Sequence, residues 1–235
     1  MPIFIGICSD NIKYEGKCIC GTCLGKCEIR NQYSELAINC GFIPIIIPVT
    51  LSKLVLEEIC KIIDCLLICG NILYPRNGII SENIDKNIIM NKLIHDRDTL
   101  LVDIMIKMNK KIIGICYGMQ FLNSYFNGKI YIDIEKQLNV KSHMKTKHPV
   151  KILKNTKLYD IFIKNKYETD IIVNSFHYAG IRPDILSNKF IINTISDDNI
   201  VEGVETENGN IFGFQYHVEK HKELFFIIKD FVELE

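Results

Sequence analysis

The sequence predicts an α/β fold, a single-domain three-layer sandwich. Helices cover both faces of a central, mostly parallel sheet, and some strands of the C-terminal half are antiparallel. Three observations support this. The 235 residues can bury a sizeable core, and 48% hydrophobic with 24% charged residues is typical of globular proteins. In the first half, short apolar runs alternate with helical patterns, as in parallel sheets with crossover helices. No linker or internal repeat divides the chain, so residues 1–235 are expected to form one domain.

The elements of the first half follow in a regular order. Residues 3–7 are an apolar run ended by Ser9, as expected for a buried strand. Tyr33, Leu36 and Ala37 follow at helical spacing, and Gly41 is placed to end that helix. Further strands are expected at residues 43–49, 65–69 and 111–115, and further helices at residues 51–62, 93–108 and 118–126.

The second half changes character, because its apolar runs are short and separated by turn-like segments. Strands are expected at residues 129–134, 150–153, 171–173, 190–194, 201–205 and 211–214. Only residues 219–232 again show a clear helical pattern. This half is therefore expected to contribute the antiparallel strands.

Composition excludes several classes of function. The 28 basic residues are balanced by 28 acidic ones and form no basic stripe, which argues against a nucleic-acid partner. The apolar stretch at residues 42–49 is far shorter than a spanning helix, so no membrane partner is expected. Ten cysteines without an export signal indicate free thiols in a reducing compartment. We expect a cytoplasmic protein.

The segment with the clearest chemical character is the junction at Cys116. A strand pattern ends at this cysteine, a helical pattern begins directly after it, and Gly114 and Gly118 flank it. A sharp strand-to-helix turn of this kind exposes a nucleophile above a sheet, and the helix N-terminus favours a thiolate and an oxyanion. On these residues alone, Cys116 is either a nucleophile or one of ten inert thiols.

A base for this nucleophile is present near the end of the chain. His217 follows the last predicted strand, and Glu219 stands two residues beyond it. An imidazole can activate a thiol at neutral pH, and a carboxylate fixes the tautomer of the imidazole. The sequence therefore predicts a Cys116–His217–Glu219 triad.

Ordered segments of the chain resemble the peptidase C26 group of γ-glutamyl hydrolases, in the class I glutamine amidotransferase superfamily. The nearest type is γ-glutamyl-γ-aminobutyrate hydrolase. The matching segments are residues 112–123 (IIGICYGMQFLN), 127–134 (NGKIYIDI), 148–150 (HPV), 173–177 (VNSFH), 198–202 (DNIVE) and 212–219 (FGFQYHVE). The resemblance implies the flavodoxin-like fold of that superfamily. It also implies a cysteine-dependent hydrolase that cleaves γ-glutamyl amide bonds through a γ-glutamyl thioester.

The resemblance also implies roles around the triad. The backbone N–H groups of Tyr117 and Asn71 would bind the oxyanion. Gln120, Ser175 and His177 would bind the substrate, although for His177 a purely structural role is an equal alternative. The chain departs from the family pattern in having a single glycine at Gly70 before Asn71, and Val218 in place of a proline.

Cys18, Cys20, Cys23 and Cys27 form a cluster that the resemblance does not explain. Four cysteines in ten residues could hold zinc or an iron–sulfur cluster, but the tight spacing of Cys18 and Cys20 favours a loop of free thiols. We therefore expect no metal and no cofactor.

Two alternatives to a stand-alone hydrolase of small-molecule γ-glutamyl substrates remain open. The chain could be a glutaminase subunit that supplies ammonia to a separate synthase partner. It could also be a non-catalytic binding relative. The sequence leaves open whether the chain forms a homodimer and which amine leaves.

Overall fold

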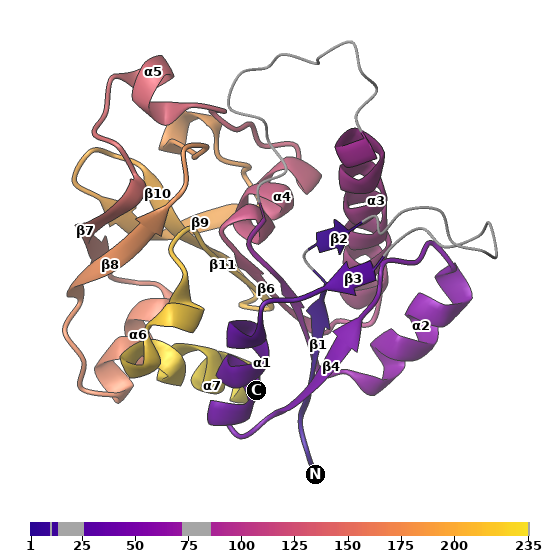
Figure 1. Cartoon of the computed structure of the whole chain (residues 1–235). Coiled ribbons are helices and arrows are strands. Elements are labelled where there is room, and N and C mark those ends of the chain that lie inside the picture. The colour runs from indigo at the N-terminus through magenta and orange to yellow at the C-terminus, as the bar shows by residue number, and fades with distance from the viewer. Residues whose placement is uncertain (10, 14–25, 72–85, 235) are drawn as a thin grey trace.

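The computed structural model describes residues 1–9, 11–13, 26–71 and 86–234 of the chain. Its centre is a nine-stranded sheet with the strand order β4-β1-β5-β6-β11-β10-β9-β7-β8 (Figure 1). This arrangement confirms the predicted α/β class and the change from parallel to antiparallel pairing along the chain. Among the described residues, no helix is both long and apolar enough to cross a membrane.

The first five strands in this order pair in parallel. They are β4 (Ile43–Ile47), β1 (Phe4–Cys8), β5 (Cys65–Ile68), β6 (Lys111–Ile115) and β11 (Ile211–Phe214). The remaining four extend the sheet through antiparallel pairs. They are β10 (Val201–Thr206), β9 (Phe190–Ser196), β7 (Met144–Ile152) and β8 (Asp170–Phe176). A separate small sheet joins β2 (Asn11–Lys13) to β3 (Lys26–Glu28).

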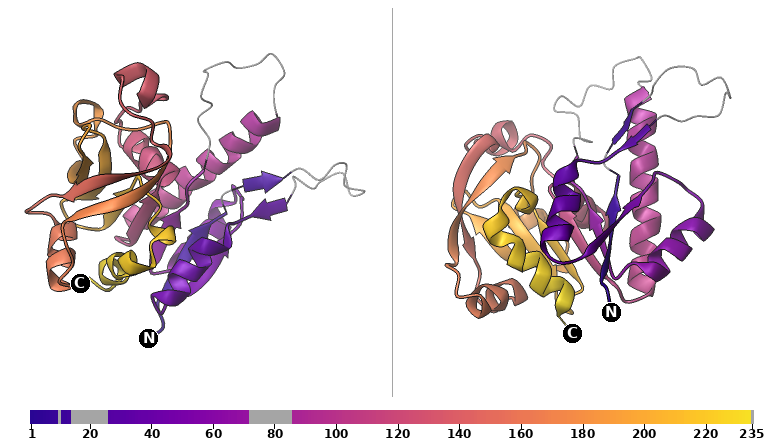
Figure 2. Two further views of the ribbon diagram at one scale, coloured as in Figure 1. Left: turned by 60° about the vertical axis from the view of Figure 1, so that its left-hand side comes forward. Right: turned by 60° about the horizontal axis from the view of Figure 1, so that its bottom comes forward.

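Helices cover both faces of the central sheet, which completes the three layers (Figure 2). Tyr33, Phe162 and Phe231 belong to the hydrophobic core on one face. The helices of this face are α1 (Asn31–Asn39), α6 (Lys157–Lys164) and α7 (Phe225–Glu233). Leu56 and Met105 belong to the core on the other face. The helices there are α2 (Lys53–Ile62), α3 (Lys86–Lys107) and α4 (Tyr117–Tyr125).

One predicted strand is wrong. Within residues 129–134, only Tyr131 forms a bridge, to Gly180, and the chain then enters the short helix α5 (Ile134–Leu138). The Asp133 carboxylate accepts the backbone N–H of Lys136 at 3.2 Å, which caps the first turn of this helix. The cap therefore begins a helix at the end of the predicted strand.

The helix predicted at residues 219–232 is also interrupted. Two 3₁₀ turns, η2 (Val218–Lys220) and η3 (Lys222–Leu224), precede α7, and a third, η1 (Pro183–Ile185), precedes β9. The turn η2 lies directly after the predicted base and keeps His217 and Glu219 outside a regular helix.

Candidate active site

Cys116 lies at the end of β6 and directly before α4, as the junction pattern predicts. Its backbone has φ 54° and ψ −104°, a conformation that costs energy for any residue with a Cβ. The flanking glycines make the turn sterically feasible. A Cβ on Gly118 would lie 2.3 Å from the Ile68 carbonyl oxygen, and one on Gly114 would lie 2.6 Å from the backbone of Gly118. The turn places Cys116 at the N-terminal end of α4.

The structure brings His217 and Glu219 to this cysteine. The Nδ1 atom of His217 lies 2.5 Å from Oε1 of Glu219, and both side chains are buried. Burial by itself lowers the pKa of His217. Hydrogen bonds to Cys116 and Glu219, together with their charges, outweigh this effect and raise the pKa to about 9. The imidazole is thus held between a thiol and a carboxylate and is stabilised in its protonated form.

Asn174 positions the backbone of His217, a role that sequence reasoning missed. Its Nδ2 donates to the His217 carbonyl oxygen at 2.9 Å, and its Oδ1 accepts the His217 N–H at 3.1 Å. These two bonds hold the residue on both sides of its Cα, although Val218 lacks the constraint of a proline. The matching segment at residues 173–177 contains this signal, but its pattern points first to Ser175 and His177.

The turn after β5 approaches the triad closely at Gly70. A Cβ on Gly70 would lie 2.8 Å from Cε1 of His217, 2.9 Å from the Tyr33 hydroxyl and 3.3 Å from Cβ of Cys116. The Gly70 N–H donates to the Tyr33 hydroxyl at 2.8 Å. The single glycine of this turn is therefore the position where the backbone must pass the side chains of Cys116 and His217.

A small pocket opens at Cys116. Its lining residues are Asn71, Cys116, Gln120, Phe176, His177, Tyr178 and Ala179. Asn71 and Cys116 thus line the same pocket, and Tyr117 is the first residue of α4. Their roles as oxyanion donors stay predictions.

The predicted substrate-binding residues differ in their positions. The Gln120 side chain lines the pocket, and its Nε2 donates to the Ala179 carbonyl oxygen at 2.9 Å and to Oε1 of Gln215 at 3.0 Å. His177 also lines the pocket. The structure does not bring Ser175 to it, because Ser175 is fully buried and absent from the pocket lining.

Of the four-cysteine cluster, Cys18, Cys20 and Cys23 lie outside the described residues. Cys27 is an exposed free thiol at β3. The expectation of a free-thiol loop therefore stays a prediction.

Comparisons with known proteins identify the family and the fold of this chain. The family model of Peptidase C26 matches residues 4–219. The chain is 30% identical over 190 residues to the putative glutamine amidotransferase PB2B2.05 of Schizosaccharomyces pombe, which covers 80% of this chain and 73% of that protein. It is 34% identical over 115 residues to GMP synthase of Dictyostelium discoideum, but this match covers 48% of the chain and only 15% of the synthase.

Two solved structures share the fold. A putative GMP synthase component from Thermoplasma acidophilum superimposes with a TM-score of 0.64 at 17% identity, covering 99% of this chain and 94% of that one. A glutamine amidotransferase from Thermotoga maritima gives a TM-score of 0.58 at 12% identity, covering 100% and 84%.

Proposed function

The chain belongs to the peptidase C26 family, within the class I glutamine amidotransferase-like superfamily, and we propose that it hydrolyses γ-glutamyl amides. The reaction would release glutamate and an amine, with γ-glutamyl-γ-aminobutyrate as a representative substrate. The observation that carries this proposal is the position of His217, which is held between Glu219 and Cys116, a residue that lines the pocket.

Each residue of the triad has a defined task in this mechanism. The His217 imidazolium, favoured by its raised pKa, holds the proton that came from the Cys116 thiol, and the sulfur attacks the γ-carbonyl carbon to form a tetrahedral oxyanion. His217 then gives that proton to the leaving nitrogen, the C–N bond breaks, and a γ-glutamyl thioester remains. Water next attacks the thioester while His217 accepts its proton. The C–S bond breaks, glutamate leaves, and His217 returns the proton it took from water, which restores the starting Cys116–His217 pair. Glu219 holds the imidazole in the required orientation throughout.

The surroundings of Cys116 support stabilisation of the oxyanion. The backbone N–H groups at a helix N-terminus point toward an anion bound there, and the dipole of α4 favours negative charge at this end. We assign the first donor to the Tyr117 N–H and the second to the Asn71 N–H. One such donor typically contributes a factor of about 10² to 10³ in kcat.

The decisive experiment is glutamate release from a panel of γ-glutamyl amides that includes glutamine and γ-glutamyl-γ-aminobutyrate. Cys116→Ala is the inactive control, and Cys27→Ser, at an exposed thiol, is the matched cysteine control. We expect release by the unmodified chain and by Cys27→Ser, and none by Cys116→Ala. Release that persists in Cys116→Ala would refute the thiol mechanism.

Alkylation provides a second test that needs no substrate. Cys116 is only 6% exposed, whereas Cys27 is exposed. If neither thiol were activated, iodoacetamide would therefore react with the exposed Cys27 first. We expect faster alkylation at Cys116 at neutral pH, as measured by peptide mass spectrometry. Slower alkylation at Cys116 than at Cys27, together with no glutamate release, would contradict the proposal and support a non-catalytic binding protein.

The GMP synthase relatives favour a second candidate function, a glutaminase that supplies ammonia to a synthase. The chemistry at Cys116 would be the same, but glutamine would be the substrate. Ammonia release restricted to glutamine, and increased by a separate synthase, would support this candidate. Preference for larger γ-glutamyl amines would support the stand-alone hydrolase.

A further inference from the structure

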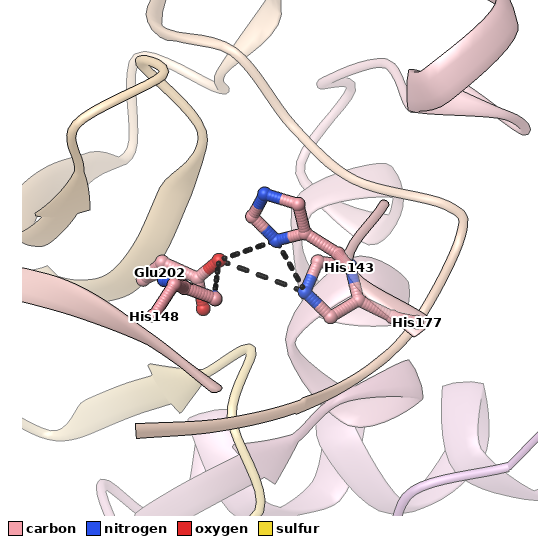
Figure 3. A group of neighbouring side chains, drawn as sticks. All are labelled: His143, His148, His177 and Glu202. Carbon is pink, nitrogen blue, oxygen red and sulfur yellow. Dashed lines mark hydrogen bonds and ion pairs between the residues drawn. The ribbon is translucent and has the colours of Figure 1, made fainter. Parts of the chain in front are cut away.

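Three histidines and a glutamate converge on one point (Figure 3). One of them, His177, also lines the pocket at Cys116. His143 precedes β7, His148 lies within β7, His177 follows β8, and Glu202 lies on β10. One nitrogen of each imidazole and one carboxylate oxygen all lie within 4.8 Å of one another. Residues from three strands and their flanking segments thus direct potential ligand atoms at one point.

The spacing of these atoms matches a tetrahedral site. A zinc ion with ligands at about 2.0–2.1 Å has ligand atoms about 3.3–3.4 Å apart. Oε1 of Glu202 lies 3.3 Å from Nδ1 of His143, 3.4 Å from Nε2 of His148 and 3.6 Å from Nε2 of His177. Nδ1 of His143 lies 3.3 Å from Nε2 of His177. Four of the six edges of the tetrahedron therefore already have nearly the required length.

Acceptor atoms on the side of each imidazole away from the cluster determine which ring nitrogen carries the proton and which one faces the other ligand atoms. Nε2 of His143 lies 2.9 Å from the Asp198 carboxylate. Nδ1 of His177 lies 2.9 Å from the Ala179 carbonyl oxygen, and Nδ1 of His148 lies 3.2 Å from that of Pro149. Carboxylates and carbonyls only accept hydrogen bonds, so the ring proton of each neutral imidazole belongs on this far side. The inward nitrogens then present lone pairs, and acceptors on the far side are typical of metal-bound histidines.

Four acceptors that face one another need a cation between them. Glu202 is 0% exposed, and among the described residues neither of its carboxylate oxygens has a hydrogen-bond partner of good geometry. The inward Nε2 of His148 is likewise unpartnered there. A divalent cation would satisfy Oε1 of Glu202 and the inward imidazole nitrogens, and the carboxylates of Glu202 and Asp198 would balance its charge.

From this geometry we propose that His143, His148, His177 and Glu202 bind a divalent transition-metal ion, best suited to Zn²⁺. Four protein ligands complete a tetrahedral shell, so the ion is structural and leaves no position for substrate. It would reach the site from the surface hollow that His143, His148 and Asp198 help to line. It would fix His177 and, through it, the adjoining pocket residues Tyr178 and Ala179. The proposal does not depend on the proposed hydrolase activity.

Metal content is the direct test. The full chain is prepared with Cys18, Cys20, Cys23 and Cys27 replaced by serine, so that these thiols contribute no ligands. The protein is stripped with a chelator, titrated with Zn²⁺ and analysed for bound zinc by mass spectrometry. We expect one zinc per chain and a rise in Tm on binding. With Co²⁺ we expect the visible bands of a tetrahedral ion without a thiolate charge-transfer band.

Variants locate the ion. His148→Gln and Glu202→Gln each remove one ligand and should abolish stoichiometric binding. Asp198→Asn, behind His143, should weaken it about 10- to 100-fold. His95→Gln is the matched control, because His95 is exposed and outside the cluster, and it should bind as the parent does.

Two outcomes would overturn the proposal. The first is a parent protein that binds neither Zn²⁺ nor Co²⁺, which would mean that a proton on one imidazole holds the cluster together. The second is unchanged binding in His148→Gln, with its fold verified by circular dichroism. The parent titration tests the proposal by itself even if a variant fails to fold.

Discussion

Replacing Glu219 with glutamine tests the electrostatic basis of the triad. The substitution keeps the shape of the side chain but removes the charge that lies 2.5 Å from Nδ1 of His217. The pKa of His217, about 9, lies above the ordinary 6.5 because Cys116 and Glu219 together outweigh the effect of burial. We therefore expect Glu219→Gln to lower the pKa of His217.

The size of this effect follows from the raised pKa. The difference between about 9 and 6.5 corresponds to about 3 kcal/mol in favour of the protonated imidazole. Cys116 and Glu219 share this stabilisation, and burial opposes it. Loss of the Glu219 charge should therefore lower the midpoint by at least about one pH unit, or about 1.4 kcal/mol.

The assay is an NMR titration of histidine side chains, which is practical because the chain has only six histidines. The His217 signal is assigned by its loss in His217→Gln. Glu223→Gln is a matched control, because Oε1 of Glu223 lies 2.9 Å from Nδ1 of His221 in the same i,i+2 arrangement outside the triad. It should leave the His217 midpoint unchanged.

Either of two results would refute this reasoning. One is a His217 midpoint at or below 6.5 in the unmodified chain, which would mean that burial dominates. The other is an equal shift in Glu219→Gln and Glu223→Gln, which would assign the effect to net charge. Where activity is found, the alkaline limb of its pH profile should move down with the midpoint in Glu219→Gln.

Three further predictions concern the same site. Asn174→Ala removes both hydrogen-bond partners of the His217 backbone, so urea denaturation should show a free energy of unfolding lower by about 2–4 kcal/mol. Asn174→Asp keeps the acceptor, so its free energy of unfolding should fall by about half as much. Gly70→Ala should slow alkylation of Cys116 at least about tenfold, because its Cβ would meet the His217 ring at 2.8 Å. Gly41→Ala, whose φ of 85° costs stability but whose Cβ meets nothing within 4 Å, should not slow it. Because its pKa is raised in the folded state, His217 should stabilise the fold fully below pH 6.5 and lose this contribution as the pH rises through about 9. This decrease in the free energy of unfolding should be absent from His217→Gln.

The parts of the site that the sequence predicted are those defined by local patterns. The apolar run before Cys116 and the two glycines around it specify a strand-to-helix turn within five residues. His217 and Glu219 are separated by one residue, so a single turn after β11 is enough to pair them. The alternation of strands and helices in the first half likewise depends on local periodicity.

The parts that were missed depend on contacts between distant segments. Asn174 meets His217 across 43 positions, and His143 meets Asp198 across 55. No local pattern encodes such distances. At residues 129–134 the difference is local, because the Asp133 cap begins a helix at the end of the predicted strand.

The end of β8 connects the two sites. Side chains alternate across a strand, so Asn174 and Phe176 share one face while Ser175 lies on the other. Asn174 binds the backbone of His217, and the Phe176 ring packs edge-on against the His217 imidazole, with 6.0 Å between centroids. This alternation explains why Ser175 is buried away from the pocket. His177, which follows Phe176, lies with its Nε2 atom 3.6 Å from Oε1 of Glu202. An ion bound there would anchor the same strand end that positions the base, so the geometry of the triad and the filling of the cluster should be coupled.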